Sequence, residues 1–379
     1  MKIVLTGVET YNKGAELMLY AILQEIERKY PEAEVFIEPV AVSQGLSYVK
    51  TRLKLRYWPY ANFVKKAHLS SVFTRFHIPT KMLKDTRAVR ADYVFDGSGF
   101  CFSDQCKMWG RMADWWDSFL SRQYKYGAKI VFLPQAFGPL ELEESKEVMS
   151  VLNKYATCIM PRERVSFDYL KKSGLVDMQK VKIYFDFTSL VEGIFPIEFE
   201  HLKYGICVIP NMKMIEKGNI SQDKYISLLS GIIAEGKKSG RPVYLLNHEG
   251  KKDEWLANQC KKSLNNNIEV VSGISAIEVK GLIDSAYLVV TSRFHGLASA
   301  LNSCVPSLAT SWSHKYSELY KDYDMDNYIL PLNDEEVAIK MLKQLCDERK
   351  NSEIRAHLRK KQKEIQDNTH AMWDYIWAL

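Results

Sequence analysis

The strongest constraint on the fold is a regular alternation of strand-like and helix-like segments through almost the whole sequence. Short apolar runs typical of buried strands are separated by longer stretches with the helical spacing of apolar residues. The first series of expected strands is Lys2 to Thr6, Glu34 to Val40, Ala91 to Phe95, Lys129 to Leu133, Thr157 to Met160 and Lys182 to Phe185. The second series is Gly205 to Ile209, Pro242 to Leu246, Glu269 to Val271, Tyr287 to Val290 and Ser307 to Ala309. This order predicts an α/β fold with parallel sheets covered by helices.

The expected helices lie between these strands. They are Lys13 to Lys29, about Gln105 to Tyr126, Leu142 to Tyr155, Arg164 to Lys172, Asp223 to Lys238, Asp253 to Leu264 and Ser275 to Asp284. The pattern breaks between Val191 and Leu202, and 379 residues suit two domains. We therefore expect doubly wound domains over residues 1–192 and 203–333. A long helical tail over 334–379 ends in Trp373, Tyr375 and Trp377, an apolar patch expected to pack back on the first domain.

Composition narrows the class of protein. Apolar residues make up 46% of the chain, yet the apolar runs are far shorter than a membrane-spanning helix needs. Met1 leads directly into a strand rather than a signal peptide, so we expect a cytoplasmic protein. The seven cysteines are scattered without C-x-x-C pairs, which indicates neither a disulfide framework nor a zinc site.

The net charge of +6 conceals a strongly basic segment. Between Lys50 and Arg90 there are eleven basic residues and one acid, a local charge of +10, so the remainder of the chain carries −4. Aromatic residues such as Trp58 and Tyr60 lie among them. Such a segment suits peripheral contact with an anionic membrane surface such as the inner face of a membrane, or contact with a lipid-linked diphosphate or with nucleic acid. A solvated helical face with ordinary packing aromatics is the alternative.

The sequence V-V-T-S-R-F-H-G-L, residues 289–297, is the most informative local motif. An expected strand gives way at Ser292 to a helix N-terminus, whose unpaired N–H groups and positive dipole favour an anion. Arg293 adds a fork of donors for carboxylate or phosphate, and His295 can move a proton near neutral pH. The alternative reading makes Arg293 a helix cap and His295 a core residue.

Other expected strands also end in loops rich in glycine and polar residues. After the first strand, Asn12 fits a helix N-cap and Gly14 permits close backbone approach, although no G-x-G-x-x-G motif is present. The third strand ends in D-G-S-G with Ser98 and Gly99, and the fourth is followed by Gln135. Loops at one sheet edge normally build one cleft, so these residues are candidate ligands.

Two further cations stand at expected helix starts. Arg162 follows the fifth strand, where a cation opposes the helix dipole unless an anion is bound. An ion pair with Glu163 or another acid is the alternative for Arg162. Lys315 begins a later helix, where an anion could also bind.

These motifs together resemble the polysaccharide pyruvyl transferase family over nearly the whole chain. The resemblance rests on R-F-H-G at 293–296 followed by Val305-Pro306 and Lys315, and on Y-N-K-G-A-E-L, D-G-S-G-F, Q-A-F-G-P-L and R-E-R-V-S in the family's order. It departs from the family where K-G-A-E replaces the usual G-D-E and D-G-S-G replaces a run of glycines. The resemblance implies two Rossmann-like halves similar to the GT-B glycosyltransferases.

The same resemblance implies transfer of pyruvate from phosphoenolpyruvate onto two hydroxyls of a sugar as a ketal. Arg162, Arg293 and Lys315 would hold the donor without a metal or other cofactor, and His295 would be the general acid. Glu16 or Asp96 would take the hydroxyl protons. The acceptor would be a sugar of an envelope or capsular polysaccharide, including a lipid-linked one, with no nucleic-acid partner. A GT-B glycosyltransferase using a nucleotide sugar and a non-catalytic ligand-binding member are the alternatives.

Overall fold

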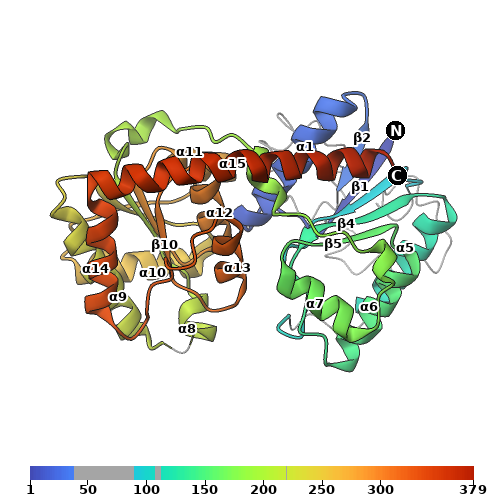
Figure 1. Ribbon diagram of the computed structural model, residues 1–379, viewed down its shortest axis with the longest axis horizontal. Coiled ribbons are helices and arrows are strands. Elements are labelled where there is room, and N and C mark those ends of the chain that lie inside the picture. The colour runs from blue at the N-terminus through green and yellow to red at the C-terminus, as the bar shows by residue number, and fades with distance from the viewer. Residues whose placement is uncertain (38–88, 107–111, 219) are drawn as a thin grey trace, which may run out of the picture. The chain divides into compact units, whose positions relative to one another are not determined.

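The computed structural model describes residues 1–37, 89–106, 112–218 and 220–379 (Figure 1). This part of the chain forms two compact units. The first comprises Met1–Tyr11, Met18–Asp186 and Ala371–Leu379, and the second comprises Asn12–Leu17 and Phe187–His370. Each unit is a parallel sheet with helices, as the alternating pattern of the sequence predicts.

The first unit is built on a five-stranded sheet in the order β2-β1-β3-β4-β5. Its strands are β1 (Lys2–Thr6), β2 (Glu34–Ile37), β3 (Tyr93–Asp96), β4 (Lys129–Gln135) and β5 (Cys158–Pro161). All neighbours are parallel, and Thr6 at the end of β1 is in register with Asp96 at the end of β3. The strand order reverses between β1 and β3, where doubly wound sheets commonly place a ligand.

Helices cover this sheet because crossover connections between parallel strands need them. They are α5 (Met112–Lys125), α6 (Glu143–Tyr155), α7 (Arg164–Ser173) and α1 (Lys13–Lys29), of which the part from Met18 onward belongs to this unit. α5 and α6 lie side by side in Figure 1 and in the contacts of the structure. The core between sheet and helices includes Phe102, Phe132 and Phe137, whose rings are in contact.

The second unit has a five-stranded parallel sheet in the order β10-β9-β6-β7-β8. Its strands are β6 (Ile206–Ile209), β7 (Val243–Leu246), β8 (Glu269–Val271), β9 (Leu288–Thr291) and β10 (Ser307–Ala309). Here the order reverses between β6 and β9, where Ile209 is in register with Thr291. Nearly every residue of these strands is buried, as expected when helices cover both faces of a sheet.

The helices of the second unit include one element more in the tail than the sequence pattern suggests. They are α8 (Lys213–Lys217), α9 (Gln222–Lys237), α10 (Gly250–Ser263), α11 (Ala276–Asp284), α12 (Phe294–Asn302), α13 (Lys315–Asp322), α14 (Glu335–Cys346) and α15 (Glu348–Trp377). The short 3-10 helices are η4 (Met178–Lys180) in the first unit, and η5 (Phe187–Leu190) and η6 (Ile197–Leu202) in the second. The tail is interrupted at Asp347, which has an extended ψ of 126° and accepts a hydrogen bond from the Lys350 N–H at 2.9 Å. Asp347 thus caps α15, a 30-residue helix.

The last residues of α15 belong to the first unit. The Trp373 ring contacts Phe95 edge to face at 5.9 Å between centroids, and Trp377 contacts Tyr93 at 5.3 Å. The indole N–H of Trp377 donates to the Glu25 carboxylate at 2.8 Å, which satisfies its one polar atom.

One expected strand is wrong. Lys182 to Phe185 runs beside β5 and donates two backbone hydrogen bonds to it, from Lys182 to Ile159 and from Tyr184 to Pro161. Pro161 has no N–H to donate in return on that side, so the ladder stops at a single bridge between Ile159 and Val181. The end of the strand expected at Glu34 to Val40, part of the helix expected at Gln105 to Tyr126, and residues 50–88 of the basic segment lie outside the described residues.

Candidate functional site

The turn after β9 lies where the strand order of the second unit reverses. Asn211 follows β6, and Ser292 and Arg293 follow β9, so these residues come from the two neighbouring strands of the switch point. Arg293 is the N-cap residue of α12, with an extended backbone, and its N–H donates to the Thr291 hydroxyl at 3.0 Å. The arrangement expected from the sequence, a strand leading into a helix N-terminus, is present here.

A buried hydrogen-bond network fixes this turn. The Ser292 hydroxyl contacts the Tyr225 hydroxyl at 2.5 Å and accepts from Thr310 at 2.6 Å. The Ser292 carbonyl accepts from the Asn211 amide at 2.6 Å and from the Tyr316 hydroxyl at 2.8 Å. Ser292, expected as a ligand, therefore uses its hydroxyl and carbonyl to hold the turn that carries Arg293.

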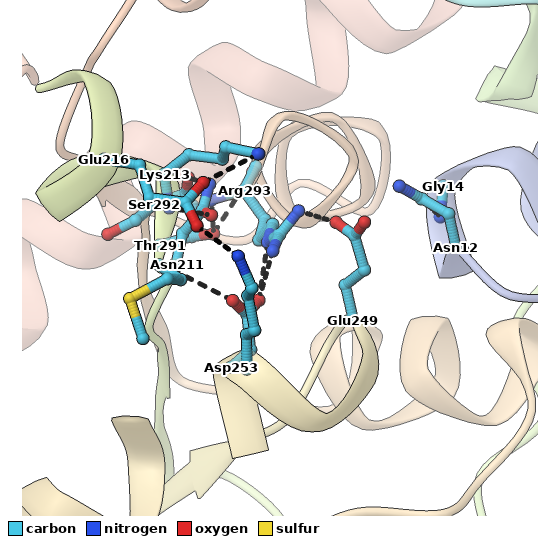
Figure 2. A network of polar contacts seen from close by, with 12 residues as sticks. Asn12, Gly14, Asn211, Lys213, Glu216, Glu249, Asp253, Thr291, Ser292 and Arg293 are labelled. Atoms are coloured by element: carbon cyan, nitrogen blue, oxygen red, sulfur yellow. Dashed lines mark hydrogen bonds and ion pairs between the residues drawn. The ribbon is translucent and has the colours of Figure 1, made fainter. Parts of the chain in front are cut away.

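Arg293 lies between two carboxylates that follow β7 (Figure 2). Its Nε donates to Asp253 at 2.7 Å, one terminal nitrogen lies 2.5 Å from the same oxygen, and the other contacts Glu249. Burial lowers the pKa of Arg293 to about 10, so the guanidinium is charged at neutral pH. Burial raises the pKa of the Asp253 carboxyl to about 7, whereas the Arg293 contact favours the carboxylate, so the pair is charged at and above neutral pH.

This geometry positions Arg293 firmly and leaves it donors for a ligand. Three atoms of the guanidinium contact the two acids, while the group carries five N–H donors in a planar fork. Asp253 is fully buried and also accepts from the Met212 N–H at 2.9 Å. Glu249 is more exposed than Asp253, with 30% of its side chain accessible.

The start of α1 packs against His295. Asn12 caps the helix as expected, because its side-chain oxygen accepts from the N–H groups of Gly14 at 2.8 Å and Ala15 at 3.3 Å. A Cβ on Gly14 would overlap the Nδ1 atom of His295, so a glycine is required for this approach. An isolated antiparallel bridge between Asn12 and Glu249 joins the same segment to the loop after β7.

Lys315 begins α13, as expected, beside three aromatic rings. Its ammonium lies 4.5 Å from the centroid of Trp312, 5.6 Å from Phe294 and 5.7 Å from Tyr316. Phe294 in turn contacts the His295 ring edge to face at 5.2 Å. Phe294 thus connects Lys315 and His295, and the second unit assembles Arg293, His295, Lys315, Asn12, Gly14 and Ser292 around one turn.

Asp96, Ser98, Gly99 and Gln135 lie in the first unit, at the ends of its neighbouring strands β3 and β4. Asp96 accepts from the Thr6 hydroxyl at 2.8 Å, the Ser98 hydroxyl at 3.0 Å and the Gln135 amide at 3.1 Å. Burial raises the pKa of Asp96, and these hydrogen bonds oppose the shift. Gly7 has a positive φ of 72°, and a Cβ there would overlap Ser98, so the D-G-S-G loop packs closely on the residue that follows β1, while Gly99 of the same loop faces Met18 of α1.

Arg162 is ion-paired with acidic side chains, which is the alternative to a role in ligand binding that the sequence left open. It is buried, with one terminal nitrogen 3.4 Å from Asp186 and Nε 4.0 Å from Glu163. Its backbone N–H donates to the Gln135 carbonyl at 3.0 Å. Glu16, one of the two expected bases, is buried at the start of α1 and pairs with Lys13 at 2.7 Å.

Sequence reasoning assigned no role to three residues of the second unit that surround Arg293. Glu249 and Asp253 hold its guanidinium, and His248 lies in the same loop. The motif N-H-E-G-K-K-D at a strand end was the available signal, and the spacing of Glu249 and Asp253 places both at one side of the first turn of α10. Among the described residues, no group of three or more His, Cys, Asp or Glu side chains is arranged to hold a metal ion.

The fold and this site define a GT-B-like α/β protein with an arginine–histidine turn at a switch point. Anabaena HepE in complex with UDP-glucose is similar, with a TM-score of 0.65, 12% identity and 100% of both chains covered. UDP-GlcNAc 2-epimerase from Neisseria meningitidis bound to UDP-GlcNAc has a TM-score of 0.61, 10% identity and 100% of both chains covered. The enzyme from Methanocaldococcus jannaschii, in complex with UDP-GlcNAc and UDP, has a TM-score of 0.55 and 12% identity over 92% of this chain and 94% of that one.

The family described as polysaccharide pyruvyl transferase matches residues 12–314, and the chain belongs to this family. Membership supports a transferase in polysaccharide biosynthesis. No curated protein matches the chain. In the part of the chain that the structure describes, no helix has the length and apolar character needed to cross a membrane.

Proposed function

We propose that this transferase moves pyruvate from phosphoenolpyruvate onto two hydroxyls of a sugar and forms a ketal. The observation that supports this most directly is the turn after β9, where the charged, partly buried guanidinium of Arg293 is positioned by Asp253 and is followed two residues later by His295. Phosphoenolpyruvate is a small anion with a carboxylate and a phosphate, the two groups that a guanidinium binds with paired hydrogen bonds.

In this mechanism the residues act on the donor as follows. Arg293 and Lys315 bind its anionic groups. His295 gives a proton to the methylene carbon of the donor, which makes the central carbon electrophilic. One sugar hydroxyl adds to that carbon, the C–O bond to phosphate breaks with its electron pair, and the second hydroxyl adds.

The proton balance of the reaction assigns a task to a second group. Two hydroxyl protons are released, one of which restores His295 while the other leaves on phosphate. Glu16 or Asp96 takes these protons in our proposal, since both are buried carboxylates, one in the first turn of α1 and the other at the end of β3. Asn12, Gly14, Ser98, Gly99, Gln135 and Ser292 shape the loops that the substrates contact. No metal or other cofactor is required.

The acceptor in this proposal is a sugar of an envelope or capsular polysaccharide. Its lipid-linked form would bring the basic segment from Lys50 to Arg90 to the cytoplasmic face of a membrane, where anionic headgroups attract basic residues. UDP-sugars are bound by the similar structures of HepE and the epimerases, so a nucleotide-linked sugar is an equally testable acceptor.

One experiment separates this proposal from a glycosyltransferase. The purified protein is incubated with phosphoenolpyruvate, a panel of nucleotide sugars and a panel of unlinked and lipid-linked sugars, followed by phosphorus and proton NMR. Sugar-dependent phosphate release with a new ketal methyl signal supports the proposal. Release of a nucleoside diphosphate with phosphoenolpyruvate unchanged would assign the chain as a nucleotide-sugar-dependent glycosyltransferase. Binding of phosphoenolpyruvate with no turnover on any sugar would favour a non-catalytic member.

A further inference from the structure

His248 is a buried histidine at the end of β7 that the mechanism above does not use. It lies in the loop between β7 and α10 and is 4% exposed. Its Nδ1 atom is buried and has no hydrogen-bond partner within the described residues. A buried polar nitrogen without a partner has lost its hydrogen bonds to water and gained none in return, so such an atom calls for an explanation such as an absent ligand.

The loop that carries His248 is held in place from two sides. Its next residue, Glu249, forms the isolated bridge with Asn12 and contacts the guanidinium of Arg293. Figure 2 shows Glu249 between Arg293 on one side and the labelled Asn12 and Gly14 on the other. His248 is therefore fixed within the loop that borders the Arg293 turn.

The charged groups that act on His248 come from each neighbouring element. Arg293 and His295 belong to the start of α12, and Lys13 belongs to the start of α1. The acids nearby are already engaged, because Glu16 pairs with Lys13 while Glu249 and Asp253 pair with Arg293. Burial first, and then Arg293, His295 and Lys13, lower the pKa of His248 well below its usual range. The imidazole is therefore neutral at pH 7.

We propose that His248 is a further substrate-contacting residue of this site, and that its imidazole takes up a proton from solvent when a phosphate-bearing anion binds. A dianion next to His248 reverses the local potential that Arg293, His295 and Lys13 create, and so favours the imidazolium. The protonated Nδ1 then donates a charge-assisted hydrogen bond to a phosphate oxygen. The inference rests on the proposed function for the identity of the anion as phosphoenolpyruvate, whereas inorganic phosphate offers the same chemistry.

Calorimetry tests the proton uptake directly. Phosphoenolpyruvate and inorganic phosphate are titrated separately into wild-type protein, His248→Gln and His201→Gln at pH 7, in buffers of different ionisation enthalpy. His201 is the matched control because it is an exposed histidine of the same unit, paired with Glu269 at 2.8 Å. We expect His248→Gln to bind either ligand at least about tenfold more weakly and to lose part of the wild-type proton uptake. The control should match the wild type.

A second readout makes the test independent of the variant's folding. Wild-type protein with isotope-labelled histidine is titrated with inorganic phosphate, and we expect one imidazole to change from neutral to protonated on binding. Unchanged affinity and proton uptake in a folded His248→Gln, or no histidine that changes protonation, would overturn the inference. If phosphate binds with this signature while phosphoenolpyruvate is never consumed, the proposed function fails and the inference stands. If phosphoenolpyruvate is consumed but no histidine becomes protonated when phosphate binds, the proposed function stands and the inference about His248 fails.

Discussion

Arg293 has its position set by side chains from an element it does not belong to. Asp253 of α10 is fully buried, and its carboxylate contacts both Nε and one terminal nitrogen of Arg293. The guanidinium is therefore oriented before any ligand binds. Preorganisation of this kind lowers the entropic cost of binding an anion. It also explains why a lysine, which has no planar fork, would be a poor substitute here.

Replacing Arg293 by alanine should weaken donor binding by roughly 2 to 4 kcal/mol, the scale of truncating one partner of a desolvated charge pair. The variant also leaves Asp253 without its cation, so unfolding should be measured alongside calorimetry with phosphoenolpyruvate. Arg349→Ala, which removes an exposed arginine paired with Glu353 on α15, is the control and should bind as wild type. Unchanged affinity in a folded Arg293→Ala protein would remove Arg293 from the donor site.

His295→Gln keeps a polar side chain of similar size but cannot act as an acid. If His295 supplies the proton in the transition state, kcat should fall by about 10² to 10⁴ while donor binding is largely retained. Steady-state kinetics combined with calorimetry measures both quantities. A variant that loses donor affinity yet turns over normally at saturation would make His295 a ligand, and the acid would have to be another group.

Among the helices and strands, the positions of the strand-to-helix turns could be predicted from the sequence, whereas the side chains that pack around those turns could not. The turn at Ser292 and the cap at Asn12 follow from local patterns, because strand periodicity and capping chemistry are local. The pairing of Arg293 with Asp253 depends on how β7 and β9 flank β6, which no local pattern contains. The wrong strand at Lys182 to Phe185 has a similar origin, since Pro161 in the neighbouring strand decides whether a ladder forms.

The contact between α1 and α12 should be sensitive to a single methyl group. Gly14→Ala places a Cβ on the imidazole of His295, so the ring or the helix start must shift. We expect kcat to fall clearly, while the protein stays folded and its melting temperature changes little. Gly231→Ala in α9 is the matched control, because its Cβ meets the movable side chain of Glu335. Equal kinetics for the two variants would show that His295 tolerates displacement.

The connection between α8 and α10 should depend on pH through Glu216. Hydrogen bonds from Lys213 and Lys252 lower the pKa of Glu216 from 4.5 to about 2. A depressed folded-state pKa contributes stability above the unfolded pKa, and this contribution is lost as the pH falls from about 4.5 toward 2. Glu216→Gln should therefore be less stable than wild type at pH 7.

Urea denaturation of wild type and Glu216→Gln at several pH values tests this. The difference between them should narrow below about pH 4.5. Glu353→Gln, whose partners Arg349 and Lys350 lie on its own helix, should show a smaller effect because it joins no two elements. A constant difference across the whole pH range would assign the effect of Glu216 to packing.

At the scale of the whole molecule, the basic segment is the most prominent departure from an even charge distribution. Its net charge of +10 between Lys50 and Arg90 predicts binding to anionic vesicles, with about 1 kcal/mol for each basic residue near the surface. Co-sedimentation should be strong at low salt and fade as the Debye length shortens. Lys65→Glu with Lys66→Glu should weaken it. Binding that is absent at low salt, or insensitive to salt, would favour acceptor binding or packing instead.

The start of α1 belongs to the second unit although the next 169 residues, Met18–Asp186, belong to the first. On a ribosome, Asn12 and Gly14 leave the exit tunnel long before their neighbours in the finished protein, Glu249 and His295 respectively, have been synthesised. The cluster around Arg293 therefore closes late, after translation has passed α12, and the second unit cannot mature as an uninterrupted stretch of nascent chain. During this interval of synthesis, Asn12–Leu17 has no contacts with the rest of the second unit. A partly folded chain of this kind exposes surface that chaperones protect from aggregation.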